Sequence, residues 1–339
     1  MIAYREIIEA QLKGFNKYAP IKEGDYAVVL DSPEKGFRER DIVKVQKIVG
    51  EFAFVSKHRR SKTGFVHVDN LEKIKMVALT TDKNEAQMIP VGVEQVTTLK
   101  DIDPELFAYF GKRIRQIFSD KMTEQIGDKI LPKINPKIVI ADFFGYNAEG
   151  FVAKWGEDKG VVFVSSKAQF PVDEVVSHEF THILSFYSKE IAEQLGDKSI
   201  QFGITDEEMD EEDILGGGDK NQEKYRHMDE HELQKAKQEE YYLQPAEVSA
   251  HTEQMLYLVH KLKRIDAQHV ALSDDMSPEE KQRAIQEIQS RPLGYYKRQV
   301  MNKLVPYAAD KYKIKDFTAR KIYESLFDNI ENYIPNSPK

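Results

Sequence analysis

Two histidines and one glutamate are spaced so that together they can hold and use a metal ion. They lie in the pentad His178-Glu179-Phe180-Thr181-His182. If the pentad is helical, His178 and His182 share a face, because residues four apart are neighbours on a helix surface. Two imidazoles placed in this way can bind one zinc ion, and Glu179 between them can act on the water that the metal binds. The spacing therefore predicts metal-assisted hydrolysis.

The residues around the pentad predict that its helix is half-buried. Residues 175–184 carry no charge outside the pentad, whereas an exposed helix would more often have a lysine or a glutamate there. An exposed helix whose histidines have no task is the alternative interpretation. Pro171 and Asp173 introduce the helix. A core stripe with spacings of 4, 3 and 4 residues would consist of Val176, Phe180, Ile183 and Tyr187. The face beside this stripe bears the two histidines.

With these flanks, the stretch resembles the active-site helix of zincin metallopeptidases. The resemblance covers residues 172–188 closely and residues 101–262 loosely, in the order helix, strands, hairpin, active-site helix and ligand helix. It implies an α+β fold. The zincin-like domain would consist of a mixed sheet, the active-site helix and a helical C-terminal part. In this family an antiparallel edge strand guides an extended substrate through backbone hydrogen bonds. By analogy, residues 151–155 would be that strand.

The third zinc ligand decides the subclass that the resemblance implies. Metzincins need a glycine and a third histidine where this chain has Ser185 and Ser188, so that branch is excluded. Gluzincin-like enzymes take a glutamate from a later helix, and the best candidate is Glu247. Pro245 suits the first position of that helix, which puts Glu247 in the first turn, where the helix dipole favours a carboxylate. Glu253 and the acids of a long polar segment are its competitors.

His251 lies one turn beyond Glu247 on the same predicted helix. It can orient Glu247 or donate a hydrogen bond to a developing oxyanion. Some gluzincins have an aspartate at this offset that holds a ligand histidine, so that role does not carry over to His251. A surface histidine without a task is the alternative.

A zinc ion on His178, His182 and Glu247 would constrain the mechanism. The metal would lower the pKa of its bound water toward neutrality, and Glu179 would take the proton as the water attacks the scissile carbonyl. Glu179 would then pass the proton to the leaving amine. The predicted function is a zinc-dependent peptidase with one Zn²⁺ as cofactor and a protein or peptide as substrate. The alternative is a non-catalytic interaction or virion-associated protein that retains a zincin fold and a structural zinc.

A second metal motif competes with the pentad. Residues 227–231, His-Met-Asp-Glu-His, match the inverted HxxEH pattern. Their flanks are mostly charged, whereas an inverted zincin needs the same buried helix. The pentad is therefore preferred as the catalytic site.

The N-terminal part has a different pattern. Residues 2–18 predict an amphipathic helix, and short β-rich runs follow at residues 26–30, 41–48, 52–56 and 64–68. Residues 1–78 would form this helix and a small β-barrel that resembles SH3-like modules, opened by GDYAVVL and closed by GFVHVDNLEKI. Such a barrel can bind a partner through its basic loop at residues 57–62, and Arg59 and Arg60 there would carry salt-sensitive binding if the partner were a nucleic acid. A solvated surface loop is the simpler interpretation.

The rest of the chain is organised around the predicted zincin-like domain at residues 101–335. Residues 79–100 lack a sustained period and predict a connector. Asp103 and Pro104 start a helix whose apolar spacing continues to Ile126, and strands are expected at residues 138–141, 151–155 and 161–165. The acidic, polar residues 196–240 cannot be ordered by burial and predict a mobile insertion. Helices are expected at residues 245–262, 278–290, 295–307 and 315–332.

Composition narrows the class of protein. The chain has 339 residues, of which 41% are hydrophobic, enough for one large domain and a smaller companion. Its net charge of -8 argues against nucleic acid as a partner, and without cysteine neither disulfides nor thiolate metal sites can form. No signal peptide or membrane-spanning run is seen, so no membrane partner is expected. We expect a cytoplasmic protein, or one in the host cytoplasm or virion if it is phage-encoded.

Overall fold

The computed structural model describes residues 20–31, 37–58, 62–78, 88–117, 135–144, 146, 148–153, 158, 160–195, 245–311 and 315–333. The chain forms two compact units, residues 1–179 and 180–339. The described residues are α+β: they form a mixed nine-stranded sheet and a set of α-helices. Within these ranges, no helix combines the length and apolar character needed to cross a membrane. The predicted helix at residues 2–18, the acidic insertion and the HxxEH motif lie outside the described residues.

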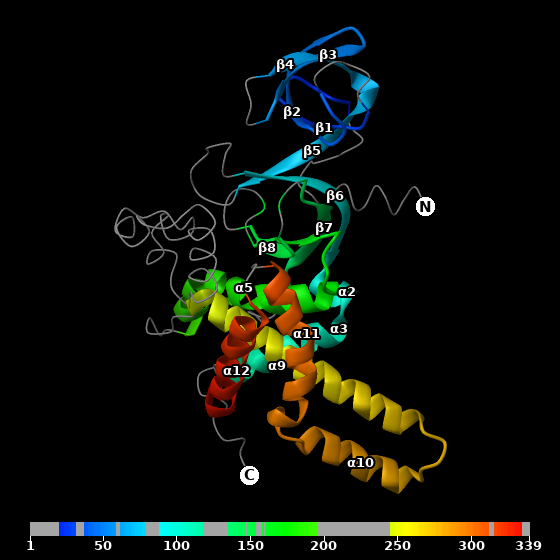
Figure 1. The fold of residues 1–339 in the computed structure, drawn as a ribbon, viewed down its shortest axis with the longest axis vertical. Helices are drawn as coiled ribbons and strands as arrows, with labels where there is room; N and C mark the ends of the chain where they lie inside the picture. The colour runs from blue at the N-terminus through cyan, green and yellow to red at the C-terminus, as the bar shows by residue number, and fades with distance from the viewer. Residues whose placement is uncertain are drawn as a thin grey trace. The chain divides into compact units, whose positions relative to one another are not determined.

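Five antiparallel strands begin the first unit, in the order β4-β3-β2-β1-β5 (Figure 1). A short 3-10 turn, Val68–Asn70, precedes the last of them. In β3 and the first part of β2, alternate residues are buried in the core around Phe37, which is typical of a sheet with one solvated face. The four runs predicted as strands match β1 to β4 to within two residues at their ends, and β5 is a further strand of this group. Their bounds are β1 Tyr26–Val29, β2 Ile42–Val49, β3 Phe52–Lys57, β4 Thr63–His67 and β5 Leu71–Ala78.

The prediction of a connector at residues 79–100 is wrong for its second part. Met88–Thr98 form the long strand β6, and Leu99–Ile102 form the short helix α2. β6 pairs with β5 through its first residues and with β7 through its later ones, so it joins the two parts of the sheet. The run from Ile89 to Val93 is buried without alternation, which explains why no strand period is visible in the sequence.

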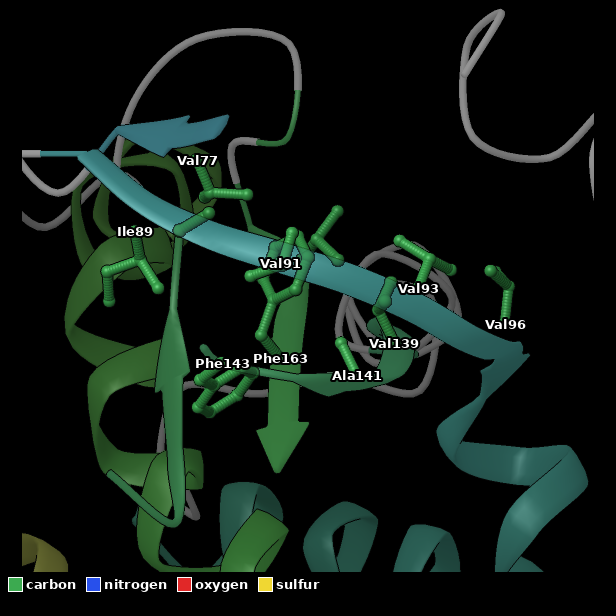
Figure 2. Close-up of a cluster of buried hydrophobic side chains, with 11 residues drawn as sticks. Val77, Ile89, Val91, Val93, Val96, Val139, Ala141, Phe143 and Phe163 are labelled. Carbon is green, nitrogen blue, oxygen red and sulfur yellow. The ribbon is translucent and has the colours of Figure 1, made fainter. Parts of the chain in front are cut away.

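The sheet continues with strands of mixed direction. β7, Lys137–Asp142, pairs antiparallel with β6 and parallel with β9, Val162–Ser165. β8, Gly150–Val152, pairs antiparallel with β9 and lies at the edge of the described sheet. The core here consists of valines from β6 and β7 with Phe143 and Phe163 (Figure 2). These strands confirm the predicted segments, although residues 154–157 are outside the described part of the chain.

Helix α3, Pro104–Ile117, starts as predicted from its sequence. The Asp103 carboxylate accepts hydrogen bonds from the amides of Glu105 and Leu106, at 3.0 and 2.9 Å. This satisfies two amides that a helix start leaves without an intrahelical partner. Leu106, Phe110 and Ile114 are buried, which confirms the predicted apolar face for the described turns. The expected continuation to Ile126 lies outside the described residues.

Ion pairs connect the first five strands to the rest of the first unit. The Asp142 carboxylate of β7 accepts hydrogen bonds from Arg40, in the turn before β2, and from Lys167 at 2.6 Å. Lys75 of β5 contacts Asp158 at 2.7 Å. Burial alone would raise the pKa of Asp142, but the hydrogen bonds from Lys167, Arg40 and the Phe144 amide outweigh burial, so that pKa lies below its ordinary value.

The second unit contains the helices predicted for the C-terminal part. They are α9 Pro245–Leu272, α10 Pro278–Ser290, α11 Leu293–Lys311 and α12 Asp316–Tyr333. The predicted ranges agree within a few residues except at α9, which extends ten residues beyond the expected end at 262. Asp266 in this extension accepts hydrogen bonds from Tyr296 at 2.8 Å and Arg291 at 3.0 Å. These bonds anchor the longer helix to α11 and to the residue that follows α10.

Candidate metal centre

The pentad lies on helix α5, Val172–Leu195, which is continuous through it. The helix starts where the amides of Glu174 and Val175 bond to the Pro171 carbonyl, at 3.0 and 3.1 Å. Two acids in the first turn, Asp173 and Glu174, suit the positive end of the helix dipole. The predicted helix and its start are confirmed.

The pentad helix is half-buried, as its sequence predicts. Val176, Phe180 and Ile183 of the predicted stripe are fully buried, and the side chain of Tyr187 is outside the described part. His178 and His182 are only partly buried. Being four residues apart on one helix, they project from the same face. The alternative interpretation, an exposed helix whose histidines bind nothing, is therefore wrong about the exposure of the helix.

Glu179 is both charged and buried, as is Glu174 in the first turn of the same helix. Its side chain is 5% exposed. No residue that the structure describes donates a hydrogen bond to its carboxylate or pairs with it. An ionised carboxylate in such a place loses hydration without gaining a protein partner, which is unfavourable unless water or a cation compensates. Glu179 therefore has the environment of a group that acts on something bound.

The edge strand β8 lies directly against this carboxylate. A methyl group on Gly150, the first residue of β8, would be 3.4 Å from Glu179 Oε1 and 2.7 Å from Val175 Cγ1. Glycine is therefore required where the strand passes over α5. The predicted edge, residues 151–155, was assigned one residue late: the described strand is Gly150–Val152.

Glu149 fixes the approach of β8 to α5. Its carboxylate accepts a hydrogen bond from the Gln169 amide at 2.7 Å, just before α5, and a longer one from the Phe170 amide. Its carbonyl accepts a bond from the Ser165 amide at 2.8 Å. Phe151 stacks on Phe163 of β9, with the ring centroids 5.0 Å apart. These contacts hold the strand in place beside Glu179.

The predicted third ligand is placed only by its backbone. Glu247 is the third residue of α9, in the first turn as expected, and its side chain is outside the described part of the chain. Among the side chains that are described, no three histidines or acids are grouped to hold a metal. Glu247 as ligand, and Glu253 as its competitor, remain predictions.

His251 is not the surface residue that the alternative assumed. It is 3% exposed and meets Tyr323 of α12 edge-on, with the ring centroids 5.8 Å apart. Met255 and Val259, further along α9, are also buried. His251 thus belongs to the interior of the second unit. Its predicted role toward Glu247 or an oxyanion stays a prediction.

The donor set on α5 fits zinc. Imidazole nitrogen is a preferred zinc ligand, and two imidazoles on one helix face with a buried, unpartnered carboxylate beside them suit a site that binds and uses the ion. No protein-family model, curated protein or solved structure matches this chain.

Two positioning residues were not predicted from the sequence. Gly150 and Glu149 determine where β8 lies, and both act through contacts with residues 13 or more positions away. A glycine at the start of a strand is the one available signal, since it often marks a close approach of backbone to a neighbour. The Glu149 contacts left no signal in the local sequence.

Proposed function

We propose that this protein is a zinc-dependent peptidase of the gluzincin type. His178, His182 and Glu247 would hold one Zn²⁺, and Glu179 would be the general base. The observation that carries the proposal is the Glu179 carboxylate: it is buried, has no partner among the described residues and lies against the start of an antiparallel edge strand. A structural helix has no need for a carboxylate in this position.

Each residue of the proposed site has a different role in peptide hydrolysis. Zinc, when bound, supplies a Lewis acid that lowers the pKa of water and polarises a carbonyl. His178 and His182 contribute neutral imidazole nitrogens from one helix face. Glu179 accepts the proton of the attacking water and delivers it to the leaving amine. The low exposure of Glu179 limits competing water at this position.

Strand β8 would hold the substrate in an extended form. On one side of β8, the Glu149 carbonyl accepts a hydrogen bond from the Ser165 amide of β9, and the Ala153 amide donates one to the Val161 carbonyl, next to β9. Because bonding direction alternates along an antiparallel strand, the backbone groups of Gly150 and Val152 point to the other side, the open edge. An extended peptide can add there as a further strand.

The first five strands support a second part of the proposal. Their order and the 3-10 turn before the last strand suit an SH3-like barrel, as the sequence resemblance implies. We propose that this module accompanies a zincin-like domain and binds a partner.

Hydrolysis of a peptide library tests the enzymatic proposal. The wild type should cleave a subset of peptides, and a chelator should abolish cleavage. Glu179→Gln should lower the rate by at least about 100-fold, the usual contribution of a general base, while zinc content stays unchanged. Asp173→Asn, on the same helix, is the matched control and should retain activity. Stoichiometric zinc with no cleavage of any peptide would instead support the non-catalytic alternative.

A further inference from the structure

The outer face of strands β2, β3 and β4 carries a cluster of aromatic side chains. Residues directly opposite one another in an antiparallel sheet share a face, so the pairings define three rows across this surface. The rows are Val49–Phe52–His67, Lys47–Phe54–Phe65 and Lys44–Ser56–Thr63. We call this surface the aromatic face. The opposite face of the same strands is buried in the core around Phe37.

The aromatic face is exposed to an extent that stability does not explain. Phe52 is 42% and Phe65 is 50% exposed. The rings are arranged in two pairs, Phe54 with Phe65 and Phe52 with His67, each with centroids 5.2 Å apart. Large exposed aromatic side chains in one contiguous group are typical of a binding surface.

The charge of these strands is opposite to that of the chain. The three strands contain Lys44, Lys47 and Lys57 and no aspartate or glutamate, whereas the whole chain has a net charge of -8. Lys47 is exposed, stands in the same row as Phe54 and Phe65, and forms no ion pair with any residue that the structure describes. Lys57 is already paired with Asp41, and the Lys44 ammonium lies over the Tyr26 ring, 5.3 Å from its centroid, so Lys47 contributes most. The local charge suits an anionic partner.

We propose that the aromatic face binds single-stranded nucleic acid. Unpaired bases would stack on Phe52, Phe54 and Phe65, and the lysines at positions 44 and 47 would contact phosphates. Such sites combine positive charge with aromatic rings, and they tolerate many sequences because every base has a stacking face. Duplex is a poor ligand, because its bases are already stacked and paired.

The distribution of charge also orients the strand. Glu51 and Asp69 lie near His67, with carboxylate oxygens 3.7 and 3.6 Å from the ring nitrogens. These acids disfavour phosphates at that end of the face. The phosphates therefore lie toward Lys47 and Lys44, and bases extend over Phe54 and Phe65. The amide of Gln46, which donates to Ser56 at 2.8 Å, adds a polar border on the lysine side.

Fluorescence anisotropy with the full-length protein tests this binding. The probes are labelled oligo(dT) and oligo(U) of about 20 nucleotides and a duplex of equal length. This length exceeds the ~4–16 nucleotides that one small domain of the single-strand-binding type covers. Phe65→Ala and Phe52→Ala should each weaken single-strand binding by about 5- to 100-fold. Lys47→Gln should reduce the dependence of log affinity on log salt by about 0.7. Phe317→Ala is the matched control, since Phe317 is 66% exposed and lies under a lysine, Lys321, on α12.

Each outcome decides the proposal. Tighter binding of single strands than of duplex, lost in the β3 and β4 variants and kept in Phe317→Ala, supports it. Absence of saturable binding in the wild type, or equal affinities of wild type and Phe65→Ala, overturns it. If no oligonucleotide binds and the same variants lose a protein partner, the surface recognises protein instead. Unfolding by urea on each variant confirms that exposed-ring substitutions leave the fold intact.

Discussion

Substitution of Gly150 by alanine probes the contact between β8 and the Glu179 carboxylate. The added methyl carbon would lie 2.7 Å from Val175 Cγ1 and 3.0 Å from the Phe163 carbonyl oxygen. Carbon atoms pack best at about 3.5–4.0 Å, so the first contact is about 1 Å too short. Val175 is buried, and the Phe163 oxygen belongs to the backbone of β9, so neither can yield without moving β8 or α5.

The magnitude follows from two opposing effects. Overpacking of this kind costs about 1–3 kcal/mol. Alanine also lowers the entropy of the unfolded chain, which stabilises by about 0.4–1 kcal/mol. We expect a net loss of about 1–2 kcal/mol in the free energy of unfolding, measured by urea denaturation. Relief of the two short contacts moves β8 relative to α5, which carries Glu179, and a displacement of that carboxylate by about 1 Å should lower peptide hydrolysis by up to about 100-fold.

A second glycine separates the two effects. At Gly64, in β4, an added methyl would lie 2.7 Å from Cε2 of the buried Phe37 ring. Gly64→Ala should therefore lose comparable or somewhat less stability, since a ring can shift, while hydrolysis per folded molecule stays at the wild-type rate. If Gly150→Ala were as stable and as active as wild type, β8 would not lie against Glu179. If both variants lost stability equally and neither lost activity, the contact would have no part in catalysis.

Two further substitutions test the interactions that hold each unit together. Because the folded-state pKa of Asp142 is lowered, its contribution to stability is complete above its ordinary value of 3.8 and declines as pH falls through the lowered value. The free energy of unfolding, measured with urea, should therefore fall more between about pH 4 and 3 in the wild type than in Asp142→Asn. Equal dependence of this free energy on pH in the two proteins would refute the prediction. Tyr296→Phe removes the 2.8 Å bond to Asp266 and should lower the unfolding free energy of the chain by about 1 kcal/mol at neutral pH. A Tyr296→Phe variant as stable as wild type would show that Arg291 alone anchors α9.

The parts of the fold that were predicted correctly have a visible local pattern. β2 and β3 alternate buried and exposed residues, α3 has an aspartate cap before a proline, and the spacing of Val176, Phe180 and Ile183 identifies the buried side of α5. Each is determined by residues close together in sequence. Local patterns of this kind were sufficient for most element boundaries.

The features that escaped prediction depend on distant contacts. β6 has no alternation because both of its faces are covered, so its sequence looked like a connector. The burial of His251 depends on packing with Tyr323, more than 70 residues later. The meeting of Gly150 with Glu179 depends on how the sheet lies on α5. Aromatic residues of β3 and β4 were seen as strand formers, and only the pairing register shows that they share one exposed face.

Zinc content of the purified protein tests the central claim most directly. After exposure to zinc and removal of loosely bound metal, elemental analysis should find about one ion per wild-type chain, as a site of three protein ligands with its fourth position open to water requires. His182→Ala should lose the ion, and Glu247→Ala should bind it far more weakly. A wild type without stoichiometric zinc, or a His182→Ala variant that keeps it, would contradict the assignment of the pentad as a zinc site. Tight stoichiometric zinc in Glu247→Ala alone would remove that residue from the ligand set and leave the two histidines in place.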